Sequence, residues 1–269
     1  HLGLDAACIG NHEFDYGWEN MILQMNKAKF PILNANIFIK ETGEPVWNNP
    51  YIIIQKGELS IGVIGLHGKF AFYDTINFRM IKGVEARDEN IYLEKYLAAL
   101  KDQVDMIVVV IHHGMPGRQS SLGQTDVMRR LNSDIKLAKR FPEINVIVSG
   151  HAHTGTPDAV KVNNTLIVST NAYTTELGKL EISFDKQSKK VISHNLEYLD
   201  GFDEIILMFD MDEAGRAAAD EAASLLPANK VKIAELPEKD ANECLKKGNT
   251  QAVIKAIWNA KSYKPDGLV

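Results

Sequence analysis

The chain has 269 residues, of which 45% are hydrophobic and 24% are charged, and a formal net charge of −5. This composition excludes a disordered chain and is typical of a globular protein with one sizeable core and a smaller unit. The apolar runs are far shorter than the ~20 residues of a membrane helix, so we predict no membrane span. The acidic balance argues against a strong nucleic-acid surface, which needs a basic stripe.

The apolar periodicity and the turn signals predict an α/β chain. We expect helices at residues 18–29, 88–101 and, in large part, 121–140, and strands at residues 32–37, 51–54, 59–66, 106–110 and 145–149. The last two strands are rich in Val and Ile, as buried strands are. Asp126 and Asp134, in the third helical segment, are expected on its solvated surface.

Three polar motifs directly follow apolar runs: Gly10-Asn11-His12-Glu13-Phe14-Asp15, Ile111-His112-His113-Gly114 and Gly150-His151-Ala152-His153. Side chains at the carboxyl ends of parallel strands converge on one edge of a sheet. Imidazole nitrogens and an amide oxygen suit a divalent transition metal. A single histidine after a strand is more often packed or hydrogen-bonded, but three such motifs together predict a metal site.

The motifs GNHEFDYG, HHG and SGHAH resemble those of the calcineurin-like metallophosphoesterases, and more closely those of the 5'-nucleotidase branch. The resemblance covers about residues 1–200. It implies a four-layer α/β fold, a β-sandwich flanked by helices. It also implies a metal-dependent phosphoric-ester hydrolase in which zinc, manganese or iron activates a water against nucleotides or other phosphomonoesters.

Carried over by motif, the resemblance implies that Asn11, His112 and His151 bind one metal and that His153 binds the other. His12 and Asp15 match the family's catalytic pair, in which a carboxylate orients an imidazole. The substrate-binding residues cannot be assigned from the sequence. Glu13 and His113 receive no catalytic role: we expect Glu13 behind the ligands or at the surface, and His113 to pack or to hydrogen-bond.

The chain also departs from this family. A complete member begins with strands ending in Asp-x-His and Gly-Asp, which supply most ligands of one metal, whereas this sequence starts at His1, downstream of both. We therefore expect an N-terminally truncated domain in which one metal keeps three protein ligands and the other keeps one. A site of this kind predicts impaired catalysis.

Residues 201–269 have a different character and resemble the Toprim domain of phage primase-helicases. An apolar strand ends in Asp210-Met211-Asp212, an Ala-rich helix follows at about residues 216–226, and a short strand at residues 231–236 precedes Lys239-Asp240-Ala241-Asn242-Glu243. The resemblance implies that Asp210 and Asp212 bind magnesium. The alternative is that they are solvated carboxylates at a helix N-terminus. The family's opening strand, with its catalytic Glu, is not found, so we expect a half-domain.

We therefore predict two domains, residues 1–200 and 201–269. The first hypothesis is a metal-dependent phosphohydrolase acting on nucleotides. The alternatives are a nucleic-acid enzyme fragment of primase-helicase type, with nucleic acid reached only through the tail, and a non-catalytic fusion product. The compartment stays open, because the first domain's resemblance suggests a periplasmic or extracellular protein and the tail's suggests a cytoplasmic one.

Overall fold

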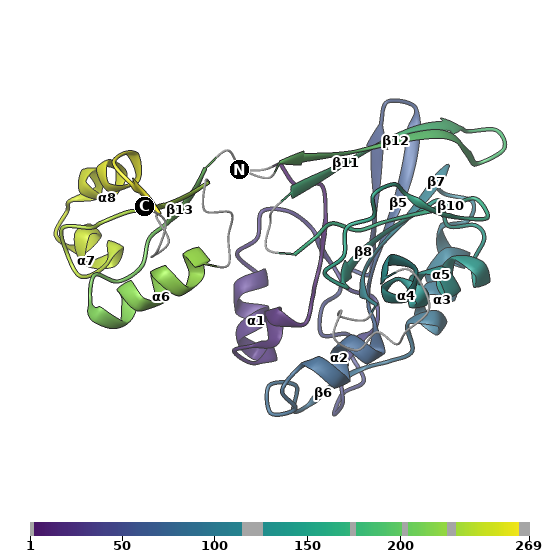
Figure 1. Ribbon diagram of the computed structural model, residues 1–269. Coiled ribbons are helices and arrows are strands. Elements are labelled where there is room, and N and C mark those ends of the chain that lie inside the picture. The colour runs from purple at the N-terminus through teal and green to yellow at the C-terminus, as the bar shows by residue number, and fades with distance from the viewer. Residues whose placement is uncertain (1–2, 115–125, 173–175, 201–203, 225–229, 264–269) are drawn as a thin grey trace. The chain divides into compact units, whose positions relative to one another are not determined.

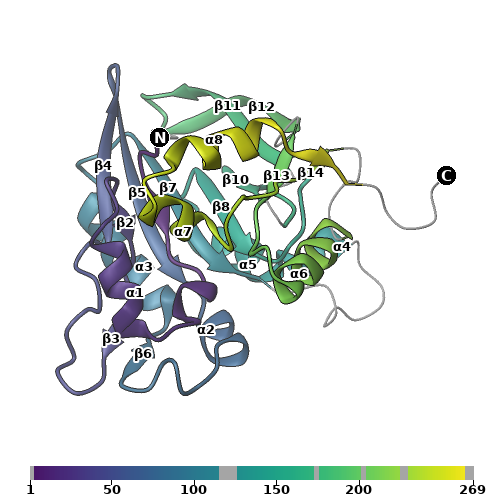
Figure 2. The same cartoon turned by 90° about the vertical axis from the view of Figure 1, so that its left-hand side faces the viewer.

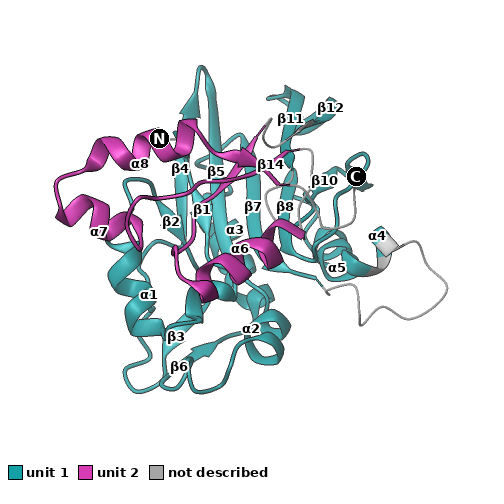
Figure 3. Cartoon of the chain, turned by 60° about the vertical axis from the view of Figure 1, so that its left-hand side comes forward, with its two compact units in different colours: residues 1–199 teal, residues 200–269 magenta. Residues whose placement is uncertain are grey.

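A computed structural model describes residues 3–114, 126–172, 176–200, 204–224 and 230–263. The chain divides into two compact units, His1–Leu199 and Asp200–Val269 (Figure 3). In the described part of the chain, no helix has the length and apolar character needed to cross a membrane.

A six-stranded sheet forms the centre of the first unit, with strand order β4-β5-β7-β8-β10-β9 (Figures 1 and 2). The inner strands β5, β7, β8 and β10 pair in parallel, and the edge strands β4 and β9 pair antiparallel to their neighbours. The bounds are β4 Tyr51–Lys56, β5 Leu59–His67, β7 Met106–His113, β8 Val146–His151, β9 Val160–Val162 and β10 Thr165–Val168. The carboxyl ends of β5, β7 and β8 therefore meet at one edge.

Helices α3 (Glu89–Leu100) and α5 (Asn132–Arg140) pack against one face of this sheet. Alternate residues of β7, namely Ile107, Val109 and Ile111, are buried with Leu93 and Leu97 of α3 in this core. Strand side chains alternate between the two faces, so the intervening residues of β7 face the other way. Adjacent residues at the end of β7 are therefore directed to opposite sides of the sheet.

The remaining elements of the first unit are short, and many of them surround a second core around Phe14 and Phe72. Two strand pairs, β1–β2 and β3–β6, and the β11–β12 hairpin complete the unit. The bounds are β1 Ala7–Cys8, a 3-10 helix at His12–Phe14, α1 Trp18–Met25, β2 Ile32–Leu33, β3 Ile37–Ile39, α2 Lys69–Thr75, β6 Val84–Ala86, α4 Asp126–Arg130, β11 Glu176–Asp185 and β12 Lys190–Asp200.

The structure confirms the α/β class and most predicted elements, but the strand predicted at residues 32–37 is wrong. The side chain of Asn34 accepts hydrogen bonds from the backbone N–H groups of Asn36 and Ile37, at 3.2 and 2.9 Å. These local bonds replace a strand ladder and turn the chain from β2 into β3, which belongs to a different sheet.

The third predicted helical segment is two helices, α4 and α5, separated at Leu131, and residues 121–125 lie outside the described chain. The expectation of a solvated Asp134 is wrong, because this residue is fully buried. The side chain of Asp126 is likewise outside what the structure describes.

The second unit has a three-stranded sheet in the order β13-β14-β15, with β13 parallel to β14 and β15 antiparallel to it. Its core contains Ala234, Leu236, Cys244 and Ala256. The bounds are β13 Ile205–Leu207, α6 Glu213–Ser224, β14 Val231–Ile233, α7 Ala241–Lys246, α8 Thr250–Trp258 and β15 Lys261–Ser262. A side chain at Gly215 would lie 2.1 Å from the carbonyl oxygen of Asp210, so the sharp entry into α6 requires glycine.

Candidate functional site

The three polar motifs of the first unit meet at the carboxyl edge of the sheet. His112 and His113 are the last two residues of β7, Asn11 follows β1, and His151 is the last residue of β8. In the β7–β8 register, His112 lies opposite Gly150 and His113 opposite His151. The parallel topology thus brings together residues about 40 and 100 positions apart in the sequence, as the hydrogen bonds among them show.

Three donor atoms converge at this edge. The Oδ1 atom of Asn11 lies 2.7 Å from Nε2 of His112, and Nδ1 of His151 lies 3.0 Å from the same nitrogen. Ligands that each lie about 2 Å from one metal ion are separated from one another by roughly 3 Å. The spacing and the donor types therefore fit a divalent cation. Nε2 of His151 is buried and has no hydrogen-bond partner among the described groups, so Nδ1 is its nitrogen within this cluster.

The histidines of this cluster are held neutral. Burial, reinforced by the neighbouring histidines His67 and His151, lowers the pKa of His112 to about 2. Burial and the nearby His153 lower the pKa of His151 to about 4. Neutral imidazole is the form that binds metals, so these surroundings favour a ligand over a cation.

Small residues make room for the His112 ring. A side chain at Gly10 would lie 2.9 Å from the ring, and one at Gly150 would lie 3.1 Å from its Nδ1 atom. Glu13 holds the first of these turns, because its carboxylate accepts a hydrogen bond from the backbone N–H of Gly10 at 2.7 Å. Glu13 therefore supports the turn that carries Asn11.

His113 points to the other face of the sheet and joins a separate buried network. Its Nε2 atom lies 3.5 Å from Glu89 of α3, and its Nδ1 atom lies 3.5 Å from Asp134 of α5. Burial acts to lower the pKa of His113, but the nearby carboxylates of Asp134 and Glu89 outweigh it and raise the pKa to about 9. Sequence reasoning missed both carboxylates, since nothing local marks them.

His67 also lies beside the cluster and was missed. It ends β5, is fully buried, and its ring centroid lies 5.4 Å from that of His112. Its Nδ1 atom lies 3.0 Å from the carbonyl oxygen of Gly68, and burial lowers its pKa to about 4. Its position at the end of a buried parallel strand, opposite His112 in the register, is the signal that could have identified it.

The predicted catalytic pair is present and faces outward. Nδ1 of His12 donates to Oδ2 of Asp15 at 2.9 Å, and the two side chains are 74% and 54% exposed. His153 follows His151 by two residues in a turn in which both residues have positive φ, 75° for His151 and 51° for His153. Within the described residues, no group of three or more His, Cys, Asp or Glu could hold a metal ion, so the candidate set depends on the amide of Asn11.

In the second unit, Asp210 and Asp212 lie between β13 and α6. The Asp212 carboxylate accepts a hydrogen bond from the backbone N–H of Gly215 at 2.9 Å and lies 3.3 Å from Nζ of Lys239. The hydrogen bond from Gly215, with that from Lys239, lowers the pKa of Asp212. The charged Asp212 carboxylate lies at the N-terminus of α6. This arrangement is compatible both with magnesium binding and with a solvated carboxylate at a helix N-terminus, the two interpretations of the sequence.

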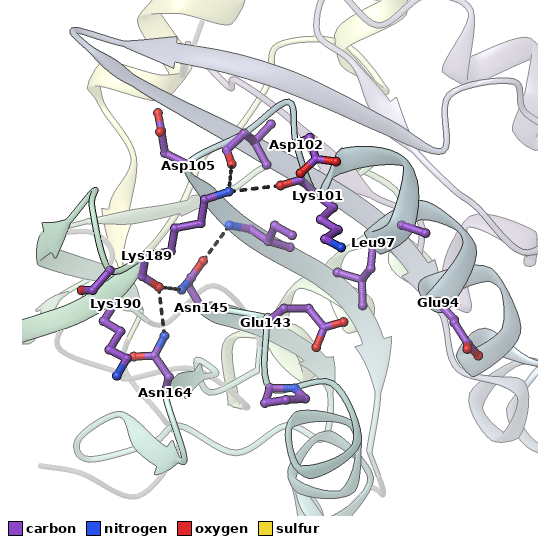
Figure 4. Close-up of a pocket in the computed structure, with 15 residues that line it drawn as sticks. Glu94, Leu97, Lys101, Asp102, Asp105, Glu143, Asn145, Asn164, Lys189 and Lys190 are labelled. Atoms are coloured by element: carbon purple, nitrogen blue, oxygen red, sulfur yellow. Dashed lines mark hydrogen bonds between the residues drawn. The ribbon is translucent and has the colours of Figure 1, made fainter.

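A cavity of about 790 Å³ lies at the opposite, amino edge of the central sheet (Figure 4). Nζ of Lys189 donates to the carbonyl oxygens of Lys101 and Val104 at 3.1 and 2.9 Å, and Asn145 and Asn164 donate to the carbonyl oxygen of Lys189. These polar groups satisfy one another and fasten the β11–β12 turn to the end of α3. The cavity is thus separate from the candidate metal centre.

Comparisons with known proteins match both parts of the chain. The family model for calcineurin-like phosphoesterases matches residues 4–155, and one for Toprim-like domains matches residues 160–245. A 5'-nucleotidase of Vibrio cholerae is 32% identical over 219 residues, which are 72% of this chain and 38% of that protein. A DNA helicase/primase of Enterobacteria phage T3 is 55% identical over 82 residues, which are 30% of this chain and 14% of that protein.

Among solved structures, a 5'-nucleotidase precursor from Thermus thermophilus is similar, with a TM-score of 0.58 and 25% identity over 73% of this chain and 38% of that one. The chain therefore spans well under half the length of each of these relatives. The Toprim-like match begins at residue 160, inside the first unit, whereas the second unit begins at Asp200.

Proposed function

The chain belongs to the calcineurin-like phosphoesterase family, and we propose that it is a metal-dependent phosphomonoester hydrolase. The observation that carries the proposal is that Oδ1 of Asn11 and Nδ1 of His151 both lie within 3.0 Å of Nε2 of His112. The two imidazole donors favour zinc or iron over magnesium, and the amide oxygen also suits manganese. Nucleotides such as AMP are the proposed substrates, because the relatives that resemble this part of the chain include 5'-nucleotidases.

In this proposal, Asn11, His112 and His151 would hold one divalent cation and His153 would contribute to a second. The chemistry that such cations supply is stabilisation of the negative charge on phosphoryl oxygens. His12 would act on the leaving group: with Nδ1 donating to Asp15, its Nε2 atom is the one directed to a substrate. A proton on Nε2 can then pass to the leaving oxygen, while the carboxylate of Asp15 stabilises the imidazolium.

We further propose that turnover by this chain is slow. The described donors make one three-ligand cluster and one further histidine, so a second cation would be held weakly. Following the same resemblance, we propose a location outside the cytoplasm for the nucleotidase-like part.

The test is to incubate the purified chain with zinc or manganese, measure the bound metal, and follow phosphate release from AMP and from an aryl phosphate. His12→Ala should lower the rate by about 10² to 10⁴ without removing the metal, the usual range for loss of a general acid. The control is His194→Ala, because His194 forms a similar pair with Asp158 at 3.1 Å in β12. Unchanged turnover in His12→Ala would refute the role of this pair.

A second candidate function rests on the second unit, where the 55% identity to a phage DNA helicase/primase favours a nucleic-acid enzyme fragment of Toprim type. Here Asp210 and Asp212 would bind magnesium, and nucleic acid would reach the chain through this unit alone. Magnesium titration of the full chain and of Asp212→Asn tests it: a site with carboxylate ligands should weaken on substitution. Absence of metal at both sites, with no phosphate release, would favour the third hypothesis, a non-catalytic fusion product.

A further inference from the structure

The turn that carries His151 and His153, residues 150–154, has an unusual backbone. Both histidines have positive φ, at 75° and 51°. A side chain in this region crowds the backbone, so such residues persist only where surrounding contacts hold them. We call residues 150–154 the two-histidine turn.

The left-handed backbone has a consequence for the donor cluster. In the register of the sheet, His151 lies opposite His113, which faces Glu89 and Asp134 on the helix side. Regular alternation would direct His151 to that side as well. Instead, Nδ1 of His151 lies 3.0 Å from His112, on the other side. The conformation of the turn, and not the strand alone, therefore assembles the cluster.

Arg130, the last residue of α4, contacts this turn from a different segment of the chain. Its Nη1 atom donates to the carbonyl oxygen of His153 at 3.4 Å and to the hydroxyl of Thr154. The hydroxyl of Thr154 in turn donates to the carbonyl oxygen of Ala152 at 3.1 Å. One guanidinium nitrogen thus fixes a backbone carbonyl and a buried side chain within two successive residues of the turn.

The packing around this contact leaves little space for another arrangement. Ala152 is fully buried and Thr154 is 7% exposed. A side chain at Gly114 would lie 2.7 Å from the carbonyl oxygen of Arg130 and 3.2 Å from the Cβ atom of Ala152. The end of β7, the end of α4 and the two-histidine turn are therefore in close contact. Nε of Arg130 is buried and has no hydrogen-bond partner among the described groups, so it is Nη1 that contacts the turn there.

We propose that Arg130 is a positioning residue that holds the two-histidine turn in its left-handed conformation and so keeps His151 and His153 directed at the metal centre. What the histidines bind rests on the proposed function, whereas the effect of Arg130 on the turn does not. Arg130 acts through the carbonyl of His153 and the hydroxyl of Thr154.

The first measurement is the affinity of the full chain for zinc or manganese by titration calorimetry, in wild type, Arg130→Met, Arg130→Lys and Thr154→Val. We expect about tenfold weaker binding in Arg130→Met, because residues that orient metal ligands typically contribute 10 to 100-fold. Arg130→Lys keeps a cationic donor and should recover part of this loss. The control is Arg140→Met: Arg140 is an exposed arginine of α5 that lies 4.0 Å from Glu94, and its loss should leave metal affinity unchanged.

The second measurement needs no metal. Backbone NMR of the metal-free chain reports amide exchange at residues 152–155 and the N–H to Hα coupling of His151 and His153. Faster exchange and altered couplings in Arg130→Met and Thr154→Val, with the unfolding midpoint near that of Arg140→Met, would support the proposal. The double variant Arg130→Met/Thr154→Val should change the amide exchange and couplings of the turn little more than either single variant does, because both substitutions remove the same contact.

The outcomes separate the two proposals. If wild type binds no metal but the turn loosens in Arg130→Met, the proposed function fails and the role of Arg130 stands. If Arg130→Met keeps the wild-type couplings and exchange in the turn, the proposal is overturned whatever the metal affinity. If Arg130→Met does not fold, the same comparison is made with Arg130→Lys and Thr154→Val.

Discussion

Two glycines in β5, Gly62 and Gly65, provide matched substitutions with different expected effects on stability. A Cβ atom at Gly65 would lie 2.3 Å from Cβ of Leu33 and 2.6 Å from the backbone carbon and oxygen of the same residue. A Cβ atom at Gly62 would lie 3.0 Å from the end of the Leu100 side chain and 3.3 Å from Val104. The close contacts of Gly65 include backbone of β2, which cannot rotate away, whereas those of Gly62 are longer and involve side-chain atoms alone.

The expected magnitudes follow from these distances. For Gly65→Ala, Leu33 would have to retreat by roughly 1 Å to reach ordinary carbon–carbon contact of about 3.5 Å. Overpacking of this kind costs about 3 kcal/mol, the upper end of its usual range, because backbone must move. Gly62→Ala gains about 0.5 to 1 kcal/mol of chain entropy, which offsets a small repacking cost, so we expect a change within about 1 kcal/mol.

Urea unfolding followed by tryptophan fluorescence measures both variants. The indole of Trp47 donates to the carbonyl oxygen of Ile32 at 2.8 Å, beside Leu33, so it reports on β2 directly. A Trp258→Phe background removes the signal of the second unit, since the chain has three tryptophans and the third, Trp18, lies in the first unit. Equal free energies of unfolding for the two alanine variants would refute this account of how β2 packs on β5.

Two further predictions concern charged side chains of the first unit. Asp134→Asn should destabilise the unit by about 3 kcal/mol, because it leaves the His113 cation paired on one side only. Since the folded pKa of His113, about 9, lies above its ordinary 6.5, the wild-type advantage in unfolding free energy should be full below pH 6.5 and disappear as the pH rises through 9. An advantage that grows with pH would contradict this prediction. Lys189→Met should cost about 1 kcal/mol, since it removes the two hydrogen bonds to α3 while keeping the aliphatic stem; an unchanged urea midpoint would show that the ammonium group is only solvated.

Much of the fold could be predicted from the sequence because local patterns and tertiary packing agree. The apolar runs before His112 and before Gly150 are strands β7 and β8, and the expected helix at residues 88–101 is α3, with Asp88 capping its N-terminus. The prediction failed at residues 32–37, where the Asn34 side chain competes with the ladder. Apolar content alone does not reveal such local hydrogen bonds.

The candidate site shows the same division. The strand-end positions predicted that the three polar motifs would converge, and the family resemblance singled out Asn11, His112 and His151. In the structure, donor atoms of Asn11 and His151 lie within 3.0 Å of Nε2 of His112. Sequence reasoning could not find Arg130, because its contact with Thr154 joins two segments 24 residues apart through a side chain of no local pattern. Nor could it find that Asp134 is buried, since its ion-pair partner His113 comes from a distant strand.

The two adjacent histidines at the end of β7 make both the donor cluster and the buried carboxylate network depend on the register of this strand. His112 belongs to the metal-binding side of the sheet and His113 to the helix side, and the two environments favour opposite charge states. A slip of one residue exchanges the faces of every side chain in a strand. It would put the imidazole that belongs between two carboxylates into the donor cluster and the neutral one into the core. A one-residue insertion or deletion in β7 should therefore abolish metal binding and stability together. Only one register of β7 places both His112 and His113 in the surroundings that suit them.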